Sequence, residues 1–355
     1  MKAFTILIAL LPFSLLNAAP VVSNLSAAQR ADASKLVDIY YDVANPYTMN
    51  VTLQVSNDNG ATWAFSCALV SGDEGANISP GTGKHIVWDV LAEHPDISGS
   101  TYKFKVIADD GMPPENFAYV PPGTFLMGDT RGGGQTNELP VHSVSISALY
   151  VSKYEVTQGD WFTTMGSYPA SGAGVGPNYP VYNISWFDAL DYCNARSVAE
   201  GLTPAYTTIG TIACNWNANG YRLLTEAEWE YAARGATNDP DYLYSGSDDV
   251  DAVAWYSGNN TPNGTKPVGT KLPNGLGIYD MSGNVFEWTW DWYLSTYYSV
   301  SPSVNPTGPD TGTVRTWRGG HYSAGSIFSR ITRRGGANPG FYAINIGFRV
   351  CRKVP

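Results

Sequence analysis

The hydrophobic pattern of this chain changes once, near residue 111, and the two parts that result need different folds. Before that point, apolar and polar residues alternate over residues 37–43, 51–55 and 102–108. A period of two places the apolar side chains on one face of an extended strand, so each segment is expected to be a half-buried β-strand. No segment in this part has a convincing helical period. Residues 19–111 are therefore expected to form a compact β-sandwich.

After the turn-forming residues 111–115, the second part mixes helices, short strands and long loops. Thr157, Ser185 and Thr225 are each followed three residues later by an acidic side chain. Such a pair satisfies the exposed amides of a first helical turn, so a helix is expected to begin after each of them. Long aromatic-rich stretches without a regular period follow. The chain is therefore expected to be α+β, with residues 112–355 forming a loop-rich second domain.

The first residues indicate export. Lys2 precedes an apolar run over residues 3–16, and small residues follow at 18 and 19. This pattern predicts a cleaved signal peptide at residues 1–18. The run is too short to span a bilayer, and no later apolar run reaches ~18 residues. We therefore expect a secreted or periplasmic protein without a membrane span in the mature chain.

The charge balance argues against a nucleic-acid partner. Lys and Arg number 21 against 31 Asp and Glu, which gives a formal net charge of −10. A chain with this excess of acid would be repelled by a phosphate backbone.

Four cysteines, Cys67, Cys193, Cys214 and Cys351, contain no C-x-x-C pair. This argues against zinc-finger and thioredoxin-like sites. An oxidising compartment would permit a disulfide, and Cys193 and Cys214 are the closest pair in sequence. Small buried thiols are the alternative reading. The sequence leaves the pairing open.

Seven segments follow one another along the second part: residues 120–128, 154–157, 183–186, 221–235, 277–288, 318–320 and 345–349. In this order they resemble the sulfatase-modifying factor family, also called the formylglycine-generating enzyme-like superfamily. The resemblance covers about residues 117–353 and implies a variant C-type-lectin-like fold. The first part resembles immunoglobulin or fibronectin modules, for which spacing or adhesion is the expected role.

The resemblance raises the question of oxidase chemistry. Oxidase members of this family carry two cysteines shortly after the Arg-Gly-Gly segment, and their thiolates bind copper. Here Ala324 takes the first position and the next cysteine is Cys351. Soft Cu(I) requires soft sulfur ligands, so neither copper nor formylglycine generation is expected. An iron site would need histidines and carboxylates, and His142 and His321 are the only histidines of the second part.

The same segment supplies the candidate pocket. His321 stands where the family pocket lies, and neutral imidazole suits a base or a substrate contact near pH 7. A surface or hydrogen-bonded histidine is the alternative. The pocket candidates are His321, Tyr322, Ser323, Ser329 and Arg334.

The resemblance also implies a calcium site at Asp280, Gly283, Val285 and Glu287, with Gly283 and Val285 contributing backbone carbonyls. Hard Ca²⁺ prefers this set of oxygens. The alternative is a metal-free turn in which Glu287 pairs with an arginine.

Three functions follow from these observations. The first is a calcium-stabilised binding or accessory protein that holds an exported peptide, protein or glycan in an aromatic-lined groove. The second is an oxidoreductase of the superfamily, and the third is a structural envelope module. The groove candidates, each of which could instead pack in the core, are Trp290, Asp291, Trp292, Tyr293, His321, Tyr322, Arg330 and Arg334.

Overall fold

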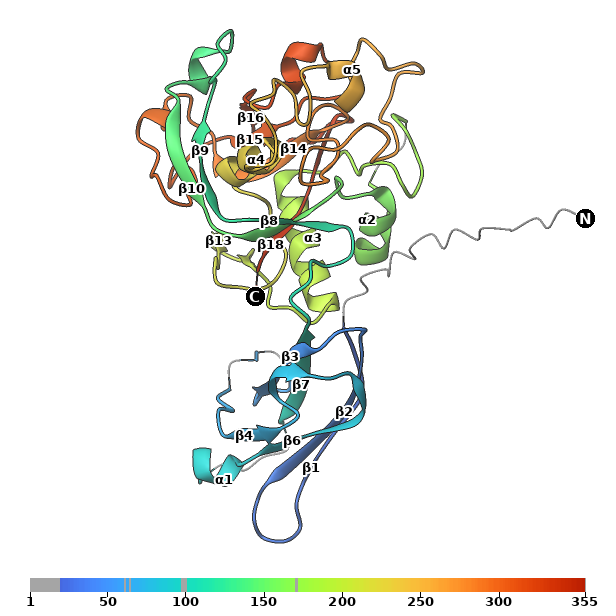
Figure 1. The fold of residues 1–355 in the computed structure, drawn as a ribbon, viewed down its shortest axis with the longest axis vertical. Coiled ribbons are helices and arrows are strands. Elements are labelled where there is room, and N and C mark those ends of the chain that lie inside the picture. The colour runs from blue at the N-terminus through green and yellow to red at the C-terminus, as the bar shows by residue number, and fades with distance from the viewer. Residues whose placement is uncertain (1–19, 61, 64, 97–100, 170–171, 355) are drawn as a thin grey trace, which may run out of the picture. The chain divides into compact units, whose positions relative to one another are not determined.

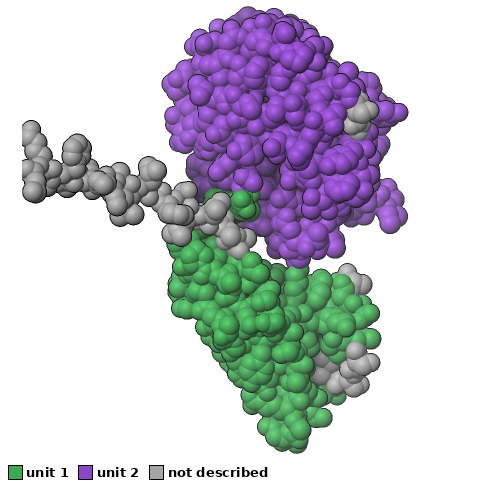
Figure 2. All heavy atoms as spheres, turned by 90° about the vertical axis from the view of Figure 1, so that its right-hand side faces the viewer, with its two compact units in different colours: residues 1–115 green, residues 116–355 purple. Residues whose placement is uncertain are grey.

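The computed structural model describes residues 20–60, 62–63, 65–96, 101–169 and 172–354, and the expected signal peptide lies outside these ranges. The chain divides into two units, one ending at Glu115 and the other beginning at Asn116 (Figure 2). Each unit has its own apolar core.

Two antiparallel sheets make up the first unit. One has the strand order β1-β2-β6-β4 and the other has the order β5-β3-β7. Both sheets contribute to one core, because alternate residues of β2, such as Ile39, and of β3, such as Val51, are buried together. The strands are β1 (Val21–Gln29), β2 (Val37–Ala44), β3 (Met49–Ser56), β4 (Val70–Gly72), β5 (Gly75–Ile78), β6 (Gly81–Trp88) and β7 (Lys103–Asp109), with a short helix α1 (Val90–Glu93) after β6.

The second unit is built from small sheets and short helices (Figure 1). Its strand orders are β18-β11-β8, β10-β9, β12-β13 and β16-β15-β14-β17. The strands are β8 (Phe117–Val120), β9 (Gly123–Met127), β10 (His142–Ile146), β11 (Leu149–Ser152), β12 (Tyr206–Thr207), β13 (Ala213–Cys214), β14 (Phe286–Trp292), β15 (Arg315–Arg318), β16 (Gly335–Ala337), β17 (Ile346–Phe348) and β18 (Cys351–Lys353). The helices are α2 (Gln158–Met165), α3 (Trp186–Ala199), α4 (Glu226–Ala233) and α5 (Val250–Val253), and the 3₁₀ turns are η1 (Thr136–Glu138), η2 (Tyr297–Ser299) and η3 (Ser326–Ser329).

The three predicted helix starts are confirmed. The side chains of Thr157, Ser185 and Thr225 accept hydrogen bonds from amides three residues on, at 3.0, 3.2 and 3.2 Å. In each case the acidic side chain accepts from the cap residue's own amide. These reciprocal bonds satisfy two donors that the first helical turn cannot satisfy internally.

Helix α4 lies inside the second unit, and all eight of its residues are buried. In Figure 1 it lies among β9, β10, β14 and β15, and it contacts each of these strands. Three of its residues are glutamates, so the helix carries charge into the core, where each charge needs a partner. Among the described residues, no helix is long and apolar enough to cross a bilayer.

Candidate functional site

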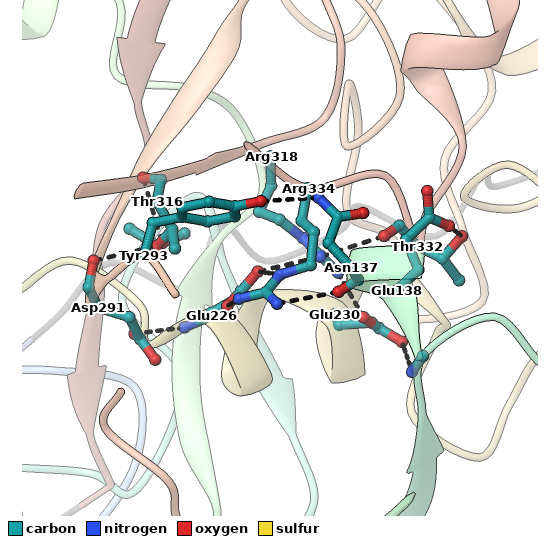
Figure 3. Close-up of polar contacts among 12 residues, drawn as sticks. Asn137, Glu138, Glu226, Glu230, Asp291, Tyr293, Thr316, Arg318, Thr332 and Arg334 are labelled. Carbon is teal, nitrogen blue, oxygen red and sulfur yellow. Dashed lines mark hydrogen bonds and ion pairs between the residues drawn. The ribbon is translucent and has the colours of Figure 1, made fainter. Parts of the chain in front are cut away.

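The charges of α4 are matched by a network of buried arginines (Figure 3). Arg334 donates to both carboxylate oxygens of Glu226, at 2.7 and 2.6 Å. Arg318 of β15 donates to Glu226 at 3.2 Å and also to Glu230. Arg330 donates to Glu138 at 2.6 Å. Paired and hydrogen-bonded in this way, the charges are compatible with a dry interior.

This network corrects part of the predicted site. Arg334 and Arg330 are buried and engaged with carboxylates, so neither guanidinium is available to a ligand. Asp291 is buried as well and accepts a hydrogen bond from the Glu226 amide at 2.7 Å. Its pKa is raised well above the usual value by burial and by the charge of Glu226. Ser329 lies in the interior, under Gly320.

His321, Tyr322 and Ser323 remain together. The His321 ring is half-buried, and Nδ1 lies 3.1 Å from Oγ of Ser323 while Nε2 lies 3.2 Å from Nδ2 of Asn345. The edge of the ring meets Phe286. Burial lowers the pKa of His321 to about 4, so the imidazole is neutral near pH 7. Tyr322 itself is buried against Tyr182 and Val285.

No described carboxylate forms an ion pair with His321, so it lacks the acidic partner that orients a catalytic histidine in a triad. The geometry therefore fits a ligand contact better than a general base.

The loop of residues 338–345 exposes apolar side chains beside this histidine. Phe341, Tyr342 and Ile344 are 48, 65 and 49% exposed. The backbone of the loop is nevertheless fixed, because Pro339 accepts from the Trp186 amide and Ala343 accepts from the Asn183 amide, both at 3.0 Å. The loop is thus attached through its backbone at two points while it presents apolar side chains to the solvent.

The predicted calcium turn has more buried carboxyl groups than arginines. Arg349 donates to both oxygens of Glu287, at 2.6 and 2.7 Å, and Trp229 donates to Glu287 as well. Glu287 is therefore paired with an arginine, as in the metal-free alternative. Asp280 accepts from the Gly269 amide through Oδ2, whereas its Oδ1 is buried without a partner.

A third carboxylate, Glu155, lies at the same turn and accepts from Asn284 at 2.6 Å and from the Val285 amide at 3.1 Å. Burial, together with the charges of Asp280 and Glu287, raises the pKa of Glu155 well above its usual value. Burial also raises the pKa of Asp280 to about 6. Glu155 is not among the residues predicted for this site, although it lies in segment 154–157, which carries part of the family resemblance.

The residues at this turn fit a cation only in part. Asp280 has an oxygen to offer, whereas Glu287 is occupied by Arg349 and Trp229. Within the described ranges, no three His, Cys, Asp or Glu side chains are arranged to hold a metal ion.

The predicted groove residues in β14 and directly after it lie in different surroundings. Trp290 and Trp292 are half-buried and contact the guanidinium of Arg315, which the sequence analysis did not select. The hydroxyl of Tyr293 accepts from Asn137 at 2.8 Å, beside the ion-pair network.

All four cysteines are free thiols, and burial raises the pKa of each.

Comparison with known proteins gives a consistent family. The model of the sulfatase-modifying factor enzyme 1-like domain matches residues 103–354. Chaperone protein LppX of Paenibacillus barcinonensis is 43% identical over 183 residues, which cover 42% of this chain and 65% of that protein. The formylglycine-generating enzyme of Streptomyces coelicolor is 29% identical over 296 residues, covering 65% of this chain and 87% of the enzyme.

Two solved structures are similar to this chain at comparable identity. Treponema denticola variable protein 1 has a TM-score of 0.61 and 29% identity, covering 67% of this chain and 95% of that protein. PvdO of Pseudomonas aeruginosa has a TM-score of 0.54 and 29% identity, covering 67 and 94% of the two chains.

Proposed function

Because the chain belongs to the sulfatase-modifying factor enzyme 1-like domain family, we propose that it is an exported binding protein of that family rather than a copper oxidase. Its ligand is a polypeptide, held on the surface formed by His321 and the 338–345 loop. The observation that carries the proposal is the exposure of Phe341, Tyr342 and Ile344 on a loop with a fixed backbone.

The placement of the thiols supports the absence of oxidase chemistry. Ala324 stands where the oxidases of the family have their first cysteine. Cys193 and Cys351 are buried, and burial raises the pKa of both thiols, which disfavours the thiolate that binds a soft metal. An oxidase would need a thiolate pair beside its substrate surface, and the segment from His321 to Asn345 contains no cysteine.

A polypeptide fits the exposed surface better than a glycan. Aromatic and large apolar side chains are typical of the centre of protein interfaces, where they supply most of the binding energy. The relative from Paenibacillus barcinonensis is named as a chaperone, and a chaperone acts on proteins. Export of the chain rests on the signal peptide predicted at residues 1–18.

Calcium at the Asp280 turn is part of the proposal. Three buried carboxylates share one arginine there, and Asp280 keeps an oxygen without a partner. A bound cation would favour the ionised forms of Glu155 and Asp280, whose pKa values are raised by burial, and Asp280 with the Gly283 and Val285 carbonyls would hold it. Glu287 would stabilise the turn through Arg349 instead of serving as a ligand.

The proposal is tested with a displayed library of random peptides, selected on the full chain in calcium. We expect selected peptides to lose about tenfold or more in affinity when Phe341 or Tyr342 is replaced by alanine. Ile209→Ala is the matched control, because Ile209 is 90% exposed elsewhere in the same unit.

Two further assays decide between the alternatives. If the protein binds to a glycan array and no peptide is selected from the library, the ligand is a carbohydrate and not a polypeptide. A cysteine-containing sulfatase-type peptide is incubated with the protein, copper and a reductant. Loss of mass at the peptide cysteine would refute the proposal in favour of an oxidase.

A further inference from the structure

Arg315 occupies a box of three tryptophans at the start of β15. The carbon at the centre of its guanidinium lies 3.8 Å from the ring centroid of Trp186, 3.5 Å from that of Trp292 and 5.0 Å from that of Trp290. Stacking of this kind stabilises a guanidinium and leaves its edges available for hydrogen bonds. Trp186 is fully buried, whereas Trp290 and Trp292 are half-buried, so the box reaches the surface of the unit only on the side of these two rings.

The hydrogen bonds of Arg315 are incomplete. Nη1 donates to the Trp290 carbonyl, Nε is buried without a partner, and no described residue accepts from Nη2. An unsatisfied buried donor costs about 1–3 kcal/mol, so such groups are rare. The free donors, Nε and Nη2, lie on the same edge of the guanidinium, and that edge matches the two oxygens of a carboxylate.

Arg315 differs in this respect from the other buried arginines of the unit. A carboxylate oxygen lies within 2.5–3.2 Å of each of Arg222, Arg234, Arg318, Arg330, Arg334 and Arg349, whereas no described carboxylate lies within ion-pairing distance of Arg315. The neighbouring acid, Asp291, is engaged with the Glu226 amide. Burial lowers the pKa of Arg315 to about 10, which is the expected effect on a cation without a counter-ion.

The box adjoins the 338–345 loop. Arg315 pairs in register with Ala337 of β16, the residue just before the loop, and β14, β15 and β16 lie side by side in Figure 1. Trp186, one wall of the box, donates its amide to Pro339 within the loop. A polypeptide bound to the loop therefore needs only a few more residues to extend to Arg315.

We propose that the Nε–Nη2 edge of Arg315, whose guanidinium stacks on Trp186 and Trp292, binds a carboxylate of the polypeptide ligand. An adjoining apolar side chain of the ligand contacts the 338–345 loop. The identity of the ligand as a polypeptide rests on the proposed function. The carboxylate site rests on the geometry of Arg315 alone. The site makes the protein selective for a C-terminus or an acidic side chain beside an apolar one.

The test uses two small probes that differ only in charge, N-acetyl-phenylalanine and N-acetyl-phenylalanine amide. Calorimetry and tryptophan fluorescence on the wild-type chain report binding, because three indoles line the box. We expect the acid to bind about 10- to 100-fold more tightly than the amide, as charge-assisted hydrogen bonds imply. Equal affinity of the acid and the amide would overturn the proposal without any variant.

Variants then locate the site. Arg315→Met is expected to remove the preference for the acid, and Arg315→Lys to weaken it, because a lysine cannot form the bidentate pair. Arg196→Met is the matched control: Arg196 stacks on Tyr221 at 4.3 Å but already pairs with Glu200. A preference that survives in a folded Arg315→Met protein would refute the assignment.

The outcomes also separate the two proposals. Binding of the acid probe that depends on Arg315, with no peptide selected from the library, would support the carboxylate site and refute the polypeptide ligand. If peptides are selected and their affinity is unchanged by Arg315→Met, the polypeptide ligand is supported and the carboxylate site is refuted. Glucuronate binding in the box where N-acetyl-phenylalanine does not bind would overturn the polypeptide assignment in favour of a sugar acid.

Discussion

Replacing Glu230 by glutamine tests whether the buried ion pairs hold the second unit together. Glu230 is fully buried and accepts hydrogen bonds from the Gly128 amide and from Arg234 and Arg318. The substitution keeps the volume of the side chain and removes its charge. Arg318, which is fully buried as well, then keeps only the more distant Glu226 as a counter-ion.

The magnitude follows in two ways. Removing one partner of a buried pair typically costs about 3–5 kcal/mol. The pKa of Glu230, in which burial is outweighed by the charges of Arg234 and Arg318, is lowered from 4.5 to about 2. That difference corresponds to about 3 kcal/mol of stability. For a unit that spans residues 116–355, we expect the melting temperature to fall by about 6 to 20 °C.

The pH dependence gives a second readout. Because the folded-state pKa is depressed, this stability is fully present above pH 4.5 and is lost as the pH falls toward 2. The difference in unfolding free energy between wild type and Glu230→Gln should therefore shrink across that window. Chemical denaturation at pH 7, 4.5 and 3 measures it.

A matched control separates burial from charge. Glu200 pairs with Arg196 at the same helical spacing at which Glu230 pairs with Arg234, but its side chain is 42% exposed. Glu200→Gln is expected to cost less than about 1 kcal/mol. Equal and small losses for Glu230→Gln and Glu200→Gln at pH 7 would refute the claim that the network stabilises the core.

Three other outcomes are expected. Gly347→Ala should destabilise the second unit by about 1–3 kcal/mol in urea unfolding, because its Cβ would lie 2.2 Å from the backbone oxygen of Val181. Gly340→Ala should not destabilise the unit, because its Cβ would meet only a side-chain atom at 3.4 Å. NMR titration should give His321 a pKa near 4. Because the unfolded chain binds this proton more readily than the folded chain, the contribution of His321 to stability should be lost as the pH falls from 6.5 toward 4. A measured pKa near 6.5 would contradict its burial. Calcium at 100 times its dissociation constant should stabilise the wild-type chain by about 2.7 kcal/mol and leave Asp280→Asn unchanged in thermal melts; equal shifts in both proteins would remove Asp280 from the site.

The helix starts could be predicted because their chemistry is local. Each cap at Thr157, Ser185 and Thr225 joins residues only three positions apart, so the pattern in the sequence contains both partners. The alternation of apolar residues in β2 and β3 is local in the same sense.

The ion-pair network could not be predicted in this way. Arg334 and Glu226 are 108 positions apart, and Arg330 and Glu138 are 192 positions apart. An arginine in a loop-rich segment is indistinguishable in sequence from one that contacts a ligand. For this reason the sequence predicts Arg330 and Arg334 as groove residues and does not distinguish Arg315, which lacks a carboxylate partner in the structure.

The 338–345 loop is attached to the second unit separately from the ion-pair network. The core of the second unit depends on contacts such as Arg334 with Glu226, whereas the loop is attached through backbone bonds at Pro339 and Ala343. Since the exposed side chains of Phe341 and Tyr342 take no part in either, replacing them should change unfolding free energy by less than about 0.5 kcal/mol. Urea unfolding of the alanine variants decides the matter, because a loss above 2 kcal/mol would mean that these side chains pack in the core and are not available to a ligand.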